Sequence, residues 1–344
     1  MNQDAAPDFS VANLVAVLAK HGIDASVSGP PRTASRMCSL LAVEPHGLYY
    51  ATREARLPES IVDSVIVCDA GNEPGDDRNT RIVTNNPQLA FYLLQRHFFG
   101  RSPRRGIHPT AIVADEASID PSAYIGPYCV IGRARVGADC ALESHVVLYD
   151  NVVLEDGVVV EPHTTLGATG VAWTWDPTGT EKIIQPQIGG VRIGEQTFLG
   201  SDVTVVRGSI NEVTTLGRHC LVAHGTKIGH GCNIGDLVHF ANNVTIAGSV
   251  TIGDESFLSA GCIVRPRISL PRGTLVGAGA VVVKNPEQEN QTLTGVPARA
   301  TGSSDRRMSG VPVRPMMSGA KWYERRCVRS LSRRSAVSAI PPLN

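Results

Sequence analysis

His230 and Gly248 are the residues of this sequence whose types and spacing best suit catalysis, because they lie 18 positions apart within a six-residue repeat. In such a repeat three units close one coil, so these two residues are expected to stack one above the other. An imidazole can take a proton from an attacking amine or hydroxyl. A glycine N–H can stabilise an oxyanion, and its missing side chain lets a thioester come close. The pair would suit acyl transfer, with His230 as general base and Gly248 as oxyanion donor. A solvated corner residue is the more usual role of a histidine in such a coil, and the spacing alone leaves both interpretations open.

Other polar pairs have the same spacing. His224 and Asn242 are 18 residues apart and are candidate substrate-binding residues, although Asn242 with Asn243 also fits a structural asparagine ladder. His145 and His163 are expected to stack as well, but no third histidine or cysteine follows at coil spacing. We therefore predict no metal site.

The elements that must position these residues are defined by a hydrophobic position that recurs every six residues. A six-residue period fits neither a helix nor an ordinary strand, and it indicates a parallel β-helix. The first repeat positions are Ile107, Val113, Ile119, Ile125 and Ile131. After a one-residue slip the repeat resumes at Val136, Leu142, Leu148, Leu154, Val160, Leu166, Ile193, Leu199, Val205, Leu216, Val222, Ile228, Ile234, Phe240, Ile246, Ile252, Leu258, Val264, Leu270, Val276 and Val282.

The repeat is interrupted twice, at about 168–191 and 206–215. Insertions in repeat proteins loop out from one face, which is often the binding face. We expect the β-helix to span residues 106–300.

Residues 1–100 lack the repeat and predict a small α/β domain. FSVANLVAVLAKH, residues 9–21, has helical spacing, and GLYYA and SVIVC have strand composition. Asn86-Pro87 indicates a strand-to-helix turn with proline at the start of the helix. Residues 303–344 are expected to form a basic tail that is helical in part. This tail has nine Lys or Arg residues and two acidic residues, Asp305 and Glu324.

Composition limits the classes of function. The formal net charge is zero, so the sequence lacks the excess of basic residues that is typical of nucleic-acid-binding proteins. No apolar run is long enough to span a bilayer. The start of the chain lacks a signal-peptide pattern, which predicts a cytoplasmic location. Five of the eight cysteines lie four residues after a repeat position and are expected to pack inside the coil as free thiols: Cys129, Cys140, Cys220, Cys232 and Cys262.

The segment HGCNIGDLVHFANNVTIAGSVTIG, which begins at His230, resembles the acyltransferases of lipid A biosynthesis. MCSLLAVEPHGLYYA, VTNNPQLAFYLL and the insert GATGVAWTWDPTGTEKIIQPQIGGVRIG favour the UDP-3-O-acylglucosamine N-acyltransferase branch. The resemblance implies a left-handed β-helix, a homotrimer, an N-terminal uridine-binding domain and acyl carrier protein as partner, with no cofactor. It also matches His230 to the family's catalytic histidine and Gly248 to its oxyanion glycine.

The sequence departs from that family at several positions. Val206-Arg207-Gly208 stands where the family has Asp-Arg-Gly, and Arg267 stands where it has an accessory histidine; Arg207 and Arg267 are kept as candidate substrate-binding residues. Residues 52–55 read TREA at the expected uracil pocket. The GVPAR ending, residues 295–299, is closer to sugar acetyltransferases. Two alternatives therefore stay open: a coenzyme A-dependent sugar O- or N-acetyltransferase, and a non-catalytic scaffold or γ-carbonic anhydrase-like protein.

Overall fold

The computed structural model describes residues 7–70, 78–100 and 102–303. The predicted tail after Ser303 lies outside the described residues. By its contacts the chain divides into two compact units, Met1–Pro103 and Arg104–Asn344. Neither helix in the described part of the chain has the length and hydropathy that a membrane span requires.

The first unit is a five-stranded sheet with two helices. The sheet order is β1-β5-β4-β3-β2; strands β2 to β5 run parallel and β1 antiparallel. Its elements are α1 (Val11–Lys20), β1 (Ser26–Ser28), β2 (Arg36–Met37), β3 (Gly47–Ala51), β4 (Val65–Cys68), β5 (Thr80–Val83) and α2 (Pro87–Phe99). The predicted turn before α2 is confirmed, because the Asn86 side chain accepts a hydrogen bond from the Leu89 N–H and Pro87 begins the helix.

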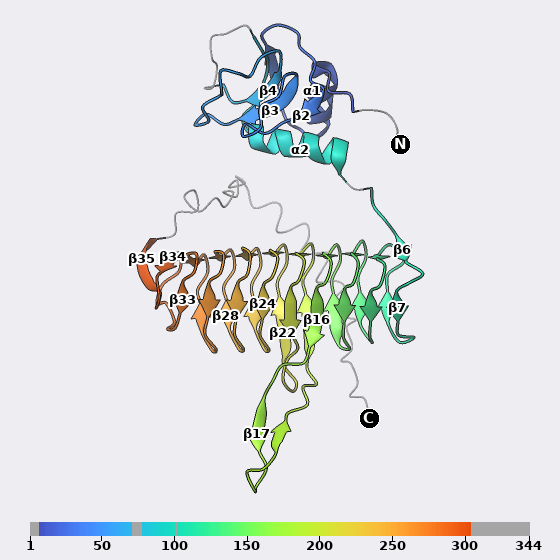
Figure 1. Ribbon diagram of the computed structural model, residues 1–344, viewed down its shortest axis with the longest axis vertical. Coiled ribbons are helices and arrows are strands. Elements are labelled where there is room, and N and C mark those ends of the chain that lie inside the picture. Colours follow the sequence, from blue (N-terminus) through green and yellow to red (C-terminus); the bar gives the residue numbers. More distant parts are fainter. Residues whose placement is uncertain (1–6, 71–77, 101, 304–344) are drawn as a thin grey trace, which may run out of the picture. The chain divides into compact units, whose positions relative to one another are not determined.

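The second unit is a left-handed parallel β-helix, as predicted, and its coils stand side by side in one row in Figure 1. Among the described residues the strands of its coils form three sheets, of nine, eight and eleven strands, and an inserted hairpin forms a separate two-stranded sheet. The nine-stranded sheet comprises β7 (Ile112–Val113), β10 (Val130–Ile131), β13 (Val147–Leu148), β16 (Thr165–Ala168), β21 (Thr204–Val206), β24 (Lys227–Ile228), β27 (Thr245–Ile246), β30 (Ile263–Val264) and β33 (Val281–Val282).

The other two sheets complete the three sides of the coil. The eight-stranded sheet comprises β8 (Ser118–Ile119), β11 (Arg135–Val136), β14 (Val152–Leu154), β19 (Gly190–Ile193), β22 (Val213–Leu216), β25 (Asn233–Ile234), β28 (Thr251–Ile252) and β31 (Ser269–Leu270). The eleven-stranded sheet comprises β6 (Gly106–Ile107), β9 (Tyr124–Ile125), β12 (Ala141–Leu142), β15 (Val159–Val160), β20 (Phe198–Leu199), β23 (Leu221–Val222), β26 (His239–Phe240), β29 (Phe257–Leu258), β32 (Leu275–Val276), β34 (Gln291–Thr294) and β35 (Arg299–Ser303).

Strand pairing confirms the predicted register. Ile228 in β24 pairs with Ile246 in β27, 18 residues on, and Ile246 pairs with Val264 in β30. The second residue of these short strands points into the coil, so Ile228, Ile246 and Val264 are almost completely buried. Burial of such side chains contributes roughly 1.5–3 kcal/mol each.

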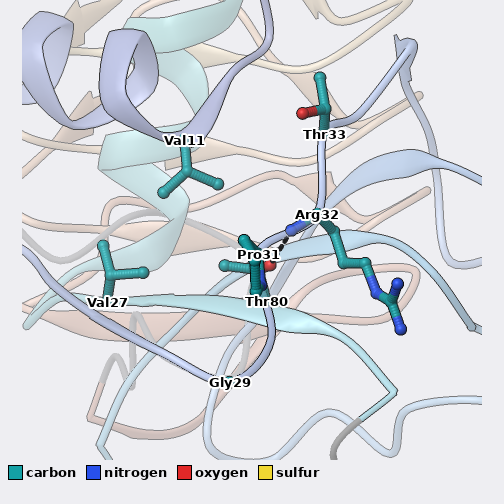
Figure 2. Close-up of a pocket in the computed structure, with 7 residues that line it drawn as sticks. All are labelled: Val11, Val27, Gly29, Pro31, Arg32, Thr33 and Thr80. Carbon is teal, nitrogen blue, oxygen red and sulfur yellow. Dashed lines mark hydrogen bonds between the residues drawn. The ribbon is translucent and has the colours of Figure 1, made fainter.

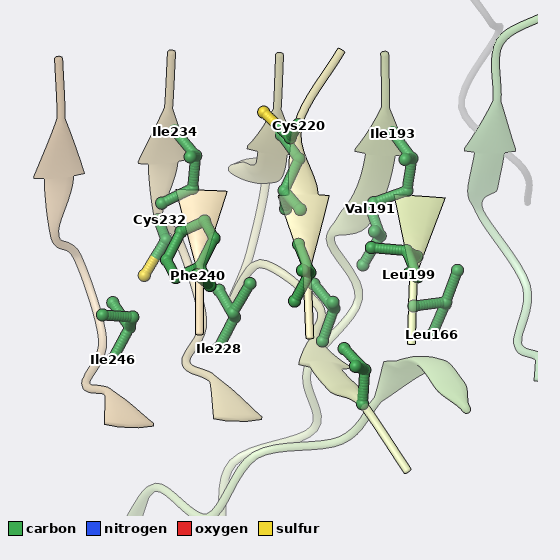
Figure 3. Close-up of a cluster of buried hydrophobic side chains, with 14 of the residues drawn as sticks. Leu166, Val191, Ile193, Leu199, Cys220, Ile228, Cys232, Ile234, Phe240 and Ile246 are labelled. Carbon is green, nitrogen blue, oxygen red and sulfur yellow. The ribbon is translucent and has the colours of Figure 1, made fainter. Parts of the chain in front are cut away.

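The cysteine prediction is confirmed for all five coil positions. Each is a free, buried thiol, and Cys220 and Cys232 lie among the aliphatic side chains of the core in Figure 3. Burial raises the pKa of the thiols, to about 11 for Cys140 and Cys232 and about 12 for Cys220 and Cys262. The thiolate, which is the reactive form, is therefore disfavoured in the folded chain.

Alkylation should show this protection. We expect iodoacetamide at pH 8 to leave Cys140, Cys220, Cys232 and Cys262 unmodified in the native protein and to modify all four in guanidinium chloride. Half-buried Cys38 is the internal comparison and should react faster. Peptide mass spectrometry measures each site, and native labelling of the coil thiols at the rate of Cys38 would contradict the packing.

Candidate active site at one corner of the β-helix

The site is built on the corner between the nine-stranded and eight-stranded sheets. His230 lies between β24 and β25, and Gly248 lies between β27 and β28 on the next coil. A Cβ atom added to Gly248 would lie 2.4 Å from Nε2 of His230. The predicted stacking of this pair is confirmed; its catalytic role stays a prediction.

Main-chain hydrogen bonds hold this corner. The carbonyl of His230 accepts from the Ser249 N–H at 2.7 Å, and the carbonyl of Gly248 accepts from the Arg267 N–H at 3.1 Å. Within the part of the chain that the structure describes, the Gly248 N–H donates to no acceptor. An unused N–H on a glycine whose backbone lies against the ring of a half-buried histidine suits an oxyanion donor.

Both insertions leave the β-helix at this same corner. The first connects β16 to β19 and the second connects β21 to β22, each running from the nine-stranded to the eight-stranded sheet. The first contains an antiparallel hairpin of β17 (Trp173–Trp175) and β18 (Lys182–Ile184), which projects from the coils in Figure 1. Sequence reasoning located the insertions but missed the hairpin, because its pairing is local and carries no repeat.

The roots of the two insertions are bonded to each other. The Ile188 N–H donates to the Ser209 carbonyl at 3.2 Å, and the Gly189 N–H donates to the Gly208 carbonyl at 3.1 Å. Gly189 is required by this close approach, because a Cβ there would lie 2.6 Å from the Gly208 carbonyl oxygen. Gly208 is required within the second insertion, because a Cβ there would lie 1.9 Å from the Glu212 carbonyl oxygen. The second insertion is therefore a braced loop beside His230.

Arg207 stabilises the same junction. Its guanidinium donates to the carbonyls of Gly167 at 2.8 Å, Asp150 at 3.0 Å and Gln187 at 3.5 Å. These bonds tie both insertions to the neighbouring coil. The structure thus places Arg207 in a supporting position, and a contact with substrate stays a prediction.

The remaining candidates lie elsewhere or point outward. Arg267 is exposed one coil beyond Gly248. His224 and Asn242 are exposed and occupy a different corner, between the eleven-stranded and nine-stranded sheets, where Nδ1 of His224 accepts from the Ser201 N–H at 2.8 Å. The structure therefore does not bring His224 and Asn242 of this chain to His230.

The expected histidine stack is also confirmed. The rings of His145 and His163 are 4.9 Å apart between centroids, and Tyr128 extends the stack at 5.1 Å from His145. No group of three or more His, Cys, Asp or Glu within the described ranges is arranged to hold a metal ion.

Sequence reasoning missed Ser209. Its hydroxyl lies 3.3 Å from Nδ1 of His230, on the side of the ring away from Gly248. Nothing in the repeat pattern could reveal it, because Ser209 belongs to an insertion and is 21 residues before His230.

The first unit has a pocket of its own, shown in Figure 2. It is lined by Val11, Val27, Gly29, Pro31, Arg32, Thr33 and Thr80. The Arg32 N–H donates to Oγ1 of Thr80 at 2.8 Å, and its guanidinium pairs with Asp63 at 3.0 Å. None of residues 52–55, the predicted uracil-binding stretch, lines this pocket.

The comparisons with known proteins show which enzymes the chain is similar to. A UDP-3-O-acylglucosamine N-acyltransferase of Pseudomonas paraeruginosa is 35% identical over 201 residues, covering 50% of this chain and 55% of the relative. The chain is similar to these N-acyltransferases. The enzyme of the same name from Coxiella burnetii is 30% identical over 174 residues, covering 43% of this chain and 50% of its own length. The chain therefore spans about half the length of the curated relatives it matches, and no family model matches it.

The similar solved structures are UDP-N-acetylglucosamine acyltransferases, which carry a different name from these curated relatives. The UDP-N-acetylglucosamine acyltransferase of Francisella novicida has a TM-score of 0.53 and 27% identity, covering 60% of this chain and 74% of that one. The UDP-N-acetylglucosamine O-acyltransferase of Moraxella catarrhalis has a TM-score of 0.54 and 25% identity, covering 68% and 86%. The resemblance to the lipid A acyltransferases is confirmed.

The supporting position of Arg207 can be tested by unfolding. Hydrogen bonds to a charged group contribute about 1.5–3 kcal/mol. We expect Arg207→Met to lower the free energy of unfolding by about that amount and to speed proteolysis between residues 168 and 191. Arg135→Met, which removes an exposed arginine of β11, is the control and should change neither. Equal behaviour of the two variants in thermal melts and limited trypsin digestion would refute the assignment.

Proposed function

We propose that this protein transfers a 3-hydroxyacyl group from an acyl carrier protein thioester to the amine of a UDP-3-O-acylglucosamine-like nucleotide sugar. The observation that carries the proposal is the juxtaposition of His230 Nε2 with the unused Gly248 N–H at the corner where both insertions emerge. The similarity to N-acyltransferases supports the substrate class.

The mechanism follows from the positions of these groups. Nε2 of His230 takes a proton from the acceptor amine as its nitrogen attacks the thioester carbonyl. The Gly248 N–H stabilises the resulting oxyanion. When the tetrahedral intermediate collapses, the carbon–sulfur bond breaks, the amide forms and the proton passes from His230 to the leaving thiolate. No covalent enzyme intermediate and no cofactor is required.

The acyl-transfer test is a measurement of thiol release with UDP-3-O-acylglucosamine as acceptor. We expect release from 3-hydroxyacyl carrier protein and a loss of about 10²- to 10⁴-fold in kcat for His230→Ala. We expect Gly248→Ala to be similarly impaired, because its Cβ would displace the imidazole. Both variants should keep the wild-type circular dichroism spectrum. Full activity of His230→Ala would overturn the mechanism, and release from acetyl coenzyme A alone would indicate the sugar acetyltransferase alternative, for which the GVPAR ending is the sequence argument.

We also propose that the protein is a homotrimer packed through the face of the eleven-stranded sheet. Outward positions on successive strands of that sheet are apolar or aromatic: Phe198, Leu221, His239, Phe257 and Leu275. The matching positions of the eight-stranded sheet are polar: Arg192, Thr215, Asn233, Thr251 and Ser269. A ladder of apolar and aromatic side chains of this kind marks an interaction surface.

Light scattering tests the assembly. The wild-type protein should have three times the chain mass of 36.6 kDa. Leu221→Asp combined with Phe257→Asp should reduce the mass toward that of one chain, because paired carboxylates in an apolar interface are costly to desolvate. Asn233→Asp on the polar face is the matched control. A trimer that survives the double substitution would place the interface elsewhere.

Two further parts of the proposal rest on the sequence. The basic tail, which lies outside the described residues, is proposed to bind an acidic acyl carrier protein. The first unit is proposed to bind the nucleotide, as its resemblance to a uridine-binding domain suggests.

A further inference from the structure

The second insertion places a side-chain hydroxyl, that of Ser209, beside the His230 ring. Ser209 Oγ lies 3.3 Å from Nδ1 of His230. Nε2 of the same ring faces Gly248. The two ring nitrogens therefore have different neighbours: Nδ1 contacts the insertion, and Nε2 faces the next coil.

The placement of Ser209 is enforced by its surroundings. Its carbonyl accepts from the Ile188 N–H, and the preceding glycine is buried between the insertions. On the following side, the Glu212 carboxylate accepts the Ile210 N–H at 2.8 Å and closes the loop. The hydroxyl is thus presented by a backbone that is bonded on both sides.

The chemistry of imidazole gives this contact a consequence. A neutral imidazole carries its proton on one nitrogen and accepts with the other. A general base that works through Nε2 must hold its proton on Nδ1, and a hydrogen-bond acceptor at Nδ1 selects that tautomer. The serine oxygen can accept from Nδ1–H while the hydroxyl hydrogen turns elsewhere.

We infer that Ser209 is the positioning residue of His230: its hydroxyl accepts the Nδ1 hydrogen, holds the ring against Gly248 and leaves Nε2 free to take the proton of the acceptor. This inference rests on the proposed function. Ser209 does not itself touch the reacting atoms.

Glu212 adds a second effect at the same place. Hydrogen bonds from the Ile210 and Glu212 N–H groups lower the pKa of its carboxyl group, with smaller contributions from Ser209 and from the charge of His230. The carboxylate stays ionised at neutral pH and stabilises an imidazolium formed during the reaction.

The kinetic test compares Ser209→Ala with Ser209→Thr. Loss of one hydrogen bond should lower kcat of the alanine variant about two- to tenfold with KM unchanged. The threonine variant keeps a hydroxyl and should recover most of the loss. Thr251→Ala, on the polar face of the β-helix, is the control and should match wild type.

A double variant separates positioning from general damage. In a His230→Ala background, Ser209→Ala should have no further effect on the residual rate, because both residues act through one imidazole. An additive loss would overturn the inference and indicate that Ser209 acts on the fold or on substrate.

The tautomer can be observed without turnover. With ¹⁵N-histidine labelling and His230→Gln for assignment, the wild-type spectrum at pH 8 should show His230 with its hydrogen on Nδ1. Ser209→Ala should populate the other tautomer. An unchanged tautomer, or a changed tautomer with unchanged kcat, would overturn the positioning role even if His230→Ala is inactive. Full activity of His230→Ala would instead remove the proposed base, whatever the tautomer.

Discussion

The register between coils is the constraint on which the rest of this structure depends. The two-residue strands of the β-helix satisfy their N–H and C=O groups by parallel pairing with the strands of adjacent coils. The pairing of Ile228 with Ile246 therefore determines which corner residues meet. His230 faces Gly248 because both follow those paired strands by two residues.

The same constraint explains why the insertions matter. A coil cannot absorb extra residues without losing its ladder, so the additional residues leave at a corner and the strands on either side re-pair. Leu166 of β16 pairs with Val205 of β21 across the first insertion, and Val205 pairs with Ile228 across the second. Because both exits lie at one corner, their roots meet, and Arg207 connects their carbonyls. The second insertion is consequently held by hydrogen bonds where it approaches His230.

The site combines two kinds of positioning. The register of the coils places Gly248 beside Nε2 of His230. The second insertion places Ser209 beside the other ring nitrogen, Nδ1. Catalytic groups are expected to be held by residues around them that are themselves locked by packing and hydrogen bonds. Here that support comes from a segment that breaks the repeat. Val206, where the resembling family has aspartate, leaves this position without a carboxylate, and Ser209 is the polar side chain of the insertion that reaches Nδ1.

Much of this molecule was determined by sequence alone, for a physical reason. A strict period converts spacing along the chain into position in space, so the β-helix, the buried cysteines, the stacked histidines and the His230–Gly248 pair could all be derived before any coordinates. The turn at Asn86-Pro87 was equally local. The hairpin of the first insertion, the supporting bonds of Arg207 and the contact of Ser209 with His230 have no period and join residues from different coils. Only tertiary structure could decide them, because their partners are chosen by where the insertions fold back and not by their distance along the sequence.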